Sequence, residues 1–216
     1  MNTNDLWQSL KESVQIEDWS LGMITLHQRQ LGELVLSTGQ VVACDPLVFA
    51  GTQPFQKTIP PGRYPVFASV ATFLENSDQR IAYALLQLDT REPVRWELAT
   101  VDGEDISSLE EDKSFGYVVD SGIGCFMDKD AAEELRRRLA AESDYAERII
   151  KDFYYSHGRG LYMELNPPGS ANVVLFASGW GDGVYASYWG YDTAGRAVCL
   201  VTNFAVIGGD DDDDDE

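Results

Sequence analysis

Cysteine and histidine are scarce in this sequence of 216 residues. The three cysteines, Cys44, Cys125 and Cys199, are widely spaced, and no two of them form a Cys-x-x-Cys pair. A disulfide framework or a zinc knuckle needs an even or clustered set, so the sequence indicates neither. We expect the thiols to be reduced and mostly buried.

Motifs of nucleophilic or phosphate chemistry are also missing. The two histidines, His27 and His157, are too few for a histidine metal site. Ser121 and Ser178 lie beside glycines, but neither completes Gly-x-Ser-x-Gly, and the chain has no Walker loop and no Gly-x-Gly-x-x-Gly. A triad of one cysteine with His157 is the weaker interpretation, because burial explains a free cysteine more often than reactivity does.

Long hydrophobic runs are absent. No segment approaches the roughly 18 uncharged apolar residues of a membrane span, and residues 1–21 lack the basic and apolar regions of a signal peptide. We therefore expect a protein of the bacterial cytosol.

Basic residues are few. The chain has 16 Lys and Arg against 36 Asp and Glu, a formal net charge of −20. Seven of the acids form the C-terminal run Asp210 to Glu216. This balance disfavours nucleic acid and anionic membranes as partners and favours a basic protein. Acidic composition also serves solubility alone, and that interpretation stays open.

The composition that is present, 44% hydrophobic with 11% aromatic residues, suits a globular core. The pattern predicts an α+β fold, predominantly antiparallel β with two central helices and a short N-terminal helix. We expect residues 1–207 to form a single domain and residues 208–216 to be a disordered acidic tail.

Apolar spacing and turn residues predict the individual elements. A helix is expected over residues 4–17, a β-hairpin around Gly39, and three meandering strands after it. Asp130 is a candidate cap for the first central helix, and Tyr145, Ile149 and Phe153 form the apolar stripe of the second. The predicted strands span residues 31–36, 41–44, 64–74, 80–88, 94–101, 116–119, 173–177, 184–189 and 197–204.

Several unusual segments carry a resemblance to a known family. They include Ser178 to Tyr185 (SGWGDGVY), Tyr188 to Asp192 (YWGYD) and Leu200 to Phe204 (LVTNF). With Gly62 to Val66 (GRYPV) and Asp120 to Gly122 (DSG), they make the chain resemble the domain-of-unknown-function family numbered 4241. The resemblance spans roughly residues 31–207 and implies no catalytic residue. Asn203 departs from the family pattern, in which Asp is commoner there, so a scheme that needs a carboxylate at this position is weakened.

Five aspartates beside glycines, prolines or strand ends are candidate chemical groups. If the fold brings several together, they can hold Mg²⁺ or Ca²⁺, or act as an acid and base pair. The competing interpretation is structural, because aspartate in tight turns and helix caps bonds nearby backbone amides. The five are Asp45, Asp120, Asp128, Asp182 and Asp192.

A dense aromatic set offers a second kind of site, a stacking or protein-contact surface. Its members are Trp180, Tyr185, Tyr188, Trp189 and Tyr191. The alternative is that these rings fill the core face of a sheet, with Tyr185, Trp189 and Tyr191 pointing one way and Tyr188 the other. Taken together, the predicted functional cluster contains Asp120, Asp128, Trp180, Asp182, Tyr185, Tyr188, Trp189 and Asp192.

Two functions from different classes follow from these residues. The first is a protein-binding module without a cofactor, such as an immunity protein that neutralises a basic bacterial toxin by complementary charge. The alternative is a hydrolase that uses a divalent metal held by the carboxylates of Asp120, Asp128, Asp182 and Asp192.

Overall fold

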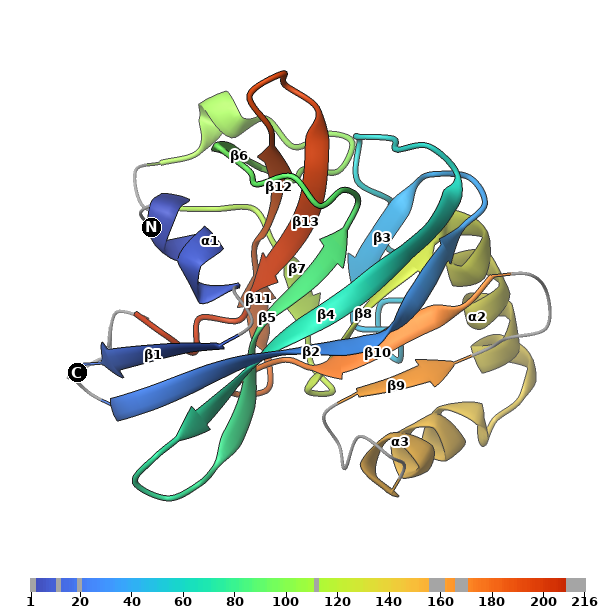
Figure 1. Cartoon of the computed structure of the whole chain (residues 1–216). Helices are drawn as coiled ribbons and strands as arrows, with labels where there is room; N and C mark the ends of the chain where they lie inside the picture. The colour runs from blue at the N-terminus through green and yellow to red at the C-terminus, as the bar shows by residue number, and fades with distance from the viewer. Residues whose placement is uncertain are drawn as a thin grey trace.

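The structure, a computed structural model, describes residues 3–10, 13–18, 21–110, 113–155, 162–165 and 171–208. Within these ranges the strands form three antiparallel sheets, of seven, four and two strands. The two larger ones pack face to face, and two helices cover the outer face of the four-stranded, smaller sheet (Figure 1). The arrangement confirms the α+β class and the predominance of antiparallel strands. The predicted acidic tail lies, apart from Gly208, outside the described residues.

Seven strands of the described chain form the larger sheet, which is built around one long pair. β2 (Gly22–Leu36) and β4 (Gly62–Phe73) pair along almost their whole lengths, with a register shift near Gln30. Such a bulge increases the local twist and lets a long pair curl over a core. The remaining strands are β1 (Ser13–Asp18) beside β2, then β5 (Gln79–Gln87), β13 (Ala197–Asn203), β12 (Ser187–Tyr191) and β6 (Arg95–Leu98) beyond β4.

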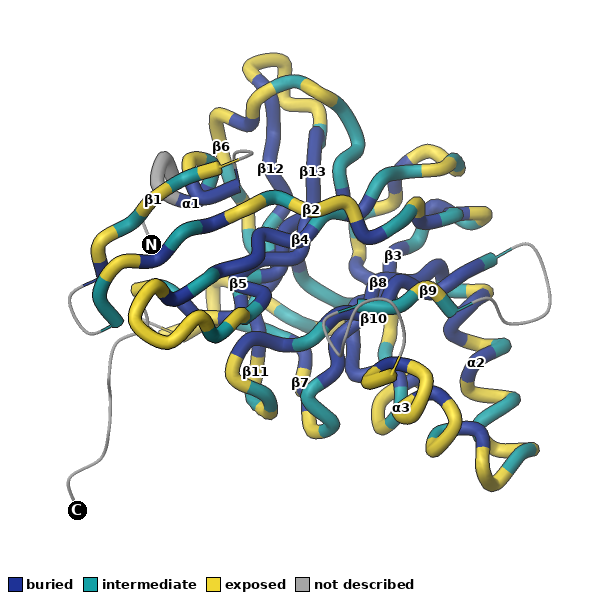
Figure 2. The backbone as a smooth tube through the Cα atoms, turned by 60° about the horizontal axis from the view of Figure 1, so that its bottom comes forward, coloured by how far each residue is buried: buried dark blue, intermediate teal, exposed yellow. Residues whose placement is uncertain are grey.

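The smaller sheet is buried on both faces. On β8, Phe126 packs into the core shared with the larger sheet, whereas Cys125 and Met127 face the helices. Because both faces are covered, its central strands are buried along nearly their whole lengths rather than at every second residue, as Figure 2 shows. Their sequences are accordingly almost continuously apolar. The order across the sheet is β3 (Val41–Cys44), β8 (Ile123–Asp128), β10 (Val173–Ala177) and β9 (Tyr162–Leu165).

The two central helices are α2 (Lys129–Ala141) and α3 (Tyr145–Tyr155). The predicted stripe of α3 is buried against the smaller sheet, which confirms it. The cap of α2 is Asp128 rather than Asp130, since its carboxylate accepts the Asp130 N–H at 3.0 Å. His157, the candidate triad partner of a cysteine, follows α3 and lies outside the described residues. No helix in the described part of the chain has the length and apolar character needed to cross a membrane.

The N-terminal helix is shorter than predicted. α1 (Thr3–Ser9) keeps Leu6 buried, but Val14 belongs to β1, where it lies opposite Leu26 of β2. The prediction of a helix over residues 4–17 was therefore wrong in its second half. Val14 and Ile16 are two residues apart, so an edge strand places both side chains against the core.

The hairpin predicted around Gly39 is wrong in its pairing. Both strands exist, but β2 pairs with β4 and β3 pairs with β8, so the turn carries the chain from one sheet to the other. Gly39 has a φ of 74°, and a Cβ there would lie 1.9 Å from the carbonyl oxygen of Ile59. Only glycine fits at this position, because the backbone has a positive φ and any side chain would collide with the Ile59 carbonyl.

The later strands are confirmed in part. β4 and β5 form the expected hairpin, but β6 is not the third strand of a meander, because it pairs with β12 at the far edge of the larger sheet. The strand predicted over residues 184–189 is divided between β11 (Gly183–Tyr185) and β12, and β9 was not predicted. The strand predicted over residues 116–119 is β7 (Tyr117–Val119), the partner of β11.

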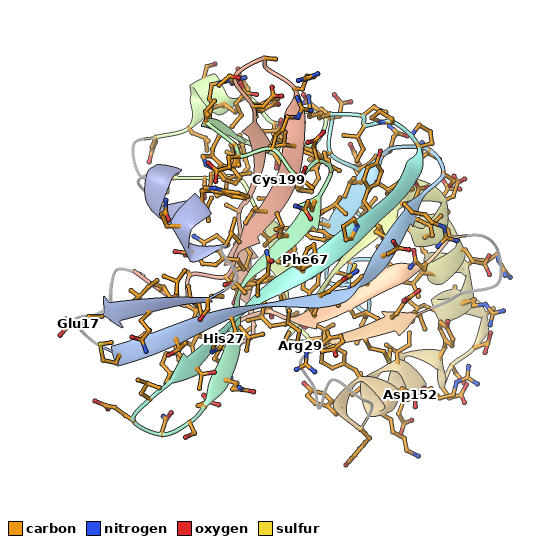
Figure 3. All side chains as sticks on the ribbon, viewed as in Figure 1. Glu17, His27, Arg29, Phe67, Asp152 and Cys199 are labelled. Carbon is orange, nitrogen blue, oxygen red and sulfur yellow. The ribbon has the colours of Figure 1, made fainter. Side chains whose placement is uncertain are left out.

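Side chains tie the two sheets together along β2. Asn172, only 3% exposed, accepts the Val35 N–H at 2.8 Å and donates to the Glu33 carbonyl at 2.6 Å. Figure 3 shows Arg29 where β2 passes the smaller sheet, and its guanidinium lies 5.1 Å from the ring centre of Tyr162 on β9. Both contacts fix how the sheets face each other.

Candidate functional site

The predicted carboxylates do not converge on one site. Asp128 is fully buried at the end of β8, where it accepts hydrogen bonds from the Ser37 hydroxyl at 3.1 Å and from the Thr38 N–H and hydroxyl at 3.0 and 2.9 Å. It also caps α2. Its oxygens therefore join the β2–β3 turn to the start of a helix.

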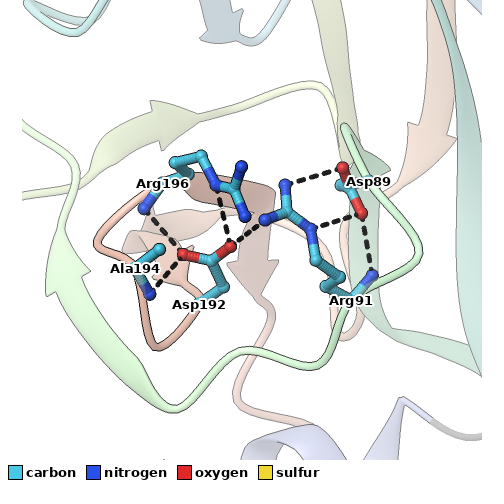
Figure 4. Close-up of polar contacts among 5 residues, drawn as sticks. All are labelled: Asp89, Arg91, Asp192, Ala194 and Arg196. Atoms are coloured by element: carbon cyan, nitrogen blue, oxygen red, sulfur yellow. Dashed lines mark hydrogen bonds and ion pairs between the residues drawn. The ribbon is translucent and has the colours of Figure 1, made fainter.

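Asp192 lies in the β12–β13 turn and is likewise occupied (Figure 4). One oxygen accepts the N–H groups of Ala194 and Arg196, both at 2.9 Å. The other accepts the guanidinium of Arg196 at 3.1 Å and that of Arg91, which also binds Asp89. The bonds from Arg91 hold the pKa of Asp89 at about 2. Asp192 therefore stabilises a turn, and its oxygens could bind a metal ion only by giving up these hydrogen bonds.

Asp120 and Asp182 are exposed, and the structure brings these two together. Val119 of β7 lies opposite Gly183 of β11, so the next residues outward are side by side at the end of the pair. Asp45 is fully buried and accepts the Asp120 N–H at 3.0 Å, so it is occupied as well. Among the described residues, no three His, Cys, Asp or Glu side chains are arranged to hold a metal ion.

The aromatic residues divide between the core and the surface. Trp189 is 3% exposed, and its ring meets that of Phe55 edge-on at 6.2 Å between centres. Tyr185 and Tyr191 are buried too, while Tyr188 is half-buried. Three of the aromatic candidates, Tyr185, Trp189 and Tyr191, therefore lie in the core, as the alternative interpretation expected.

Trp180 differs from the others because half of its surface, 50%, is exposed. It lies on a short loop, residues 178–182, that joins β10 to β11. The Tyr185 hydroxyl lies beneath this loop, 3.0 and 2.9 Å from the carbonyl oxygens of Ser178 and Gly181, and burial raises its pKa. The buried Ser178 hydroxyl also donates to the Gly181 carbonyl at 2.6 Å. These bonds fix the loop that carries Trp180.

Neighbouring elements surround the Trp180 ring. Phe73 of β4 supports it, with 5.6 Å between ring centres and 31° between planes. The Arg80 guanidinium of β5 lies 5.1 Å from its ring centre and is held by Asp78 at 2.8 Å. Tyr154 of α3, 51% exposed, helps to enclose a hollow of about 290 Å³. We call it the Trp180 hollow; it is lined by Asp78, Gln79, Arg80, Gly122, Tyr154, Ala177, Gly179, Trp180 and Gly181.

Sequence reasoning identified Trp180 but missed the residues around it. Phe73, Arg80 and Tyr154 come from β4, β5 and α3, and no spacing in the sequence links them to the loop after β10. The only sequence feature that marks any of these residues is the position of Arg80 just after the polar turn of the β4–β5 hairpin. That position indicates a turn and gives no sign of a binding site.

Comparison with known proteins gives a family but no activity. The family model described as "Protein of unknown function (DUF4241)" matches residues 34–202. That range covers the Trp180 hollow and most of both sheets. No curated protein and no solved structure matched the chain.

Proposed function

The chain belongs to the DUF4241 family, and we propose that it is a protein-binding module that docks a basic partner at the Trp180 hollow. The half-exposed Trp180 carries this proposal. Trp, Tyr and Arg are the residues most enriched in interface hot spots, and all three meet here. A loop already fixed by buried hydrogen bonds loses little conformational entropy on binding.

Charge supports a basic partner. The chain carries a net charge of −20, Asp78 lines the hollow, and the exposed Asp182 follows Gly181 on the loop. Such a field speeds the approach of a cationic protein and opposes nucleic acid and anionic membranes.

The specific case we propose is an immunity protein that neutralises a bacterial toxin in the cytosol. Masking a toxin requires affinity and needs no cofactor. The metal-dependent hydrolase is supported less well, because the buried Asp128 and Asp192 already accept hydrogen bonds from backbone and side chains.

The test is calorimetric titration of the purified protein with the basic toxin candidate encoded beside its gene. We expect binding that weakens with added salt. Trp180→Ala should weaken it by about 30-fold, since a hot-spot truncation costs about 2 kcal/mol or more.

The matched control is Ile106→Ala. Ile106 is also exposed, at 52%, but lies on the 3₁₀ helix Ile106–Ser108, away from the hollow. It should bind like the wild type, with both variants folded by circular dichroism. Absence of binding to the toxin, or equal affinity of the two variants, would contradict the proposal.

A further inference from the structure

A second cavity lies on another part of the molecule, between β3 and the β7–β11 pair. Its volume is about 220 Å³, and its walls come from β3, the segment after β3, the segment after β6, and strands β7, β11 and β12. It shares no lining residue with the Trp180 hollow. The lining includes Ala43, Phe55, Ala99, Glu104, Tyr117 and Tyr185.

The walls of this cavity are held in place without a ligand. Phe55 forms an antiparallel bridge with Val101, and its N–H donates to the Val41 carbonyl at 2.9 Å. On the opposite side, Gly116 packs so closely that a Cβ there would lie 2.7 Å from the Tyr185 carbonyl. The cavity is therefore preformed, as small-molecule sites usually are.

The lining combines aromatic rings with one carboxylate. Phe49, Phe55, Tyr117 and Tyr185 contribute rings, and Glu104 is the sole charged side chain among the described residues that line the cavity. Its Oε2 accepts the Val101 N–H at 2.8 Å, which orients the group. Its Oε1 makes no hydrogen bond to any residue that the structure describes.

We propose that this cavity binds a small organic cation, an ammonium group on an apolar body. The carboxylate of Glu104 would accept the ammonium hydrogens, and aromatic faces attract cations. An engineered apolar cavity of about 150 Å³ holds benzene, so the larger space here fits a ring with a short aminoalkyl arm. The negative charge of the whole chain adds to the preference for a cation.

The test uses benzylamine as the probe and benzyl alcohol as its neutral counterpart, both followed by titration calorimetry and by shifts of amide signals in NMR spectra. We expect benzylamine to bind and to shift the amides of Ala99 and Val101. Glu104→Gln should weaken benzylamine by at least about tenfold, the effect of losing one charge-assisted hydrogen bond, and should leave benzyl alcohol unchanged.

Three further variants separate binding in the cavity from a general effect of charge. Ala99→Leu fills the space from a buried wall position and should abolish binding of both probes. Glu75→Gln removes one charge from the β4–β5 turn, outside the cavity, and should bind benzylamine normally. Trp180→Ala should also bind it normally, so this result is independent of the protein partner. Equal binding of the two probes, equal effects of the two glutamate variants, or no binding at all would overturn the proposal.

Discussion

At the scale of single residues, buried carboxylates act as connectors in this protein. Asp45, Asp128 and Asp192 are each at most 7% exposed, and their acceptor oxygens are directed at backbone N–H groups of turns and helix starts. A buried carboxylate is tolerated when such bonds replace water. Three of the five aspartates that were candidate metal ligands in the sequence therefore hold loops to strands instead.

Replacing one of these buried aspartates should destabilise the fold strongly. Asp128→Ala removes four hydrogen bonds that join the β2–β3 turn to α2, and we expect a loss of about 3 kcal/mol in the free energy of unfolding. Asp130→Ala, in the exposed first turn of the same helix, should change it by about 0.5 kcal/mol or less. Urea unfolding measures both, and similar losses would show that Asp128 has no special role.

Cys199, labelled on β13 in Figure 3, should make stability depend on alkaline pH. Burial raises the pKa of its thiol to about 12. Above the ordinary thiol pKa, the unfolded chain releases this proton while the folded chain keeps it, so stability falls as pH rises from about 9 toward 12. Cys199→Ala should reduce the slope of unfolding free energy against pH in this window by up to about 1.4 kcal/mol per pH unit. An unchanged slope would mean that the thiol is free to ionise in the folded state.

At the scale of elements, the sequence predicted which segments are strands and helices better than how they pair. The β4–β5 hairpin and the stripe on α3 depend on local spacing, and both were found. The partners of β3 and β6 are β8 and β12, and neither is a neighbour in sequence. A turn signal such as that around Gly39 reports the local backbone only, so it cannot reveal that the next strand joins another sheet.

The candidate site shows the same limit. Trp180 stood out because Trp-Gly-Asp-Gly is an unusual segment, but its exposure depends on Phe73 and Arg80, about one hundred residues earlier in the chain. For Tyr185 and Trp189, the sequence left two faces open, and burial in the core decides between them. The exposure of these side chains is set by contacts with residues far away in the sequence, and the spacing of residues within one segment does not reveal those contacts.

Two glycines with the same backbone conformation should respond differently to a methyl group. Gly39 and Gly195 both have a φ of 74°, but a Cβ at Gly195 meets nothing within 4 Å. Gly195→Ala should therefore cost only about 1 kcal/mol of left-handed strain. Gly39→Ala adds a clash with the Ile59 carbonyl and should cost at least about 2 kcal/mol more. Thermal unfolding distinguishes the two, and equal costs would mean that the β2–β3 turn moves freely.

At the scale of the whole molecule, the two sheets share one core. Phe126 and Phe176 of the smaller sheet lie 5.0 Å apart between ring centres, and Phe176 in turn contacts Phe204, which follows β13. The smaller sheet has a second core against α2 and α3, but its other face belongs to the core that it shares with the larger sheet. We therefore expect a single cooperative transition in scanning calorimetry, with equal calorimetric and van't Hoff enthalpies. Two resolved transitions would instead show that the sheets unfold independently.

The place of β13 has a consequence for how the chain is synthesised. β5 lies inside the larger sheet, yet one of its two neighbours arrives late, since Ala84 pairs with Thr202. At ordinary translation rates the ribosome needs on the order of ten seconds to add the residues between them. During that interval an apolar strand with an open edge is exposed on the nascent chain, where edge strands invite aggregation. The growing polypeptide should therefore rely on chaperones until its last strand emerges.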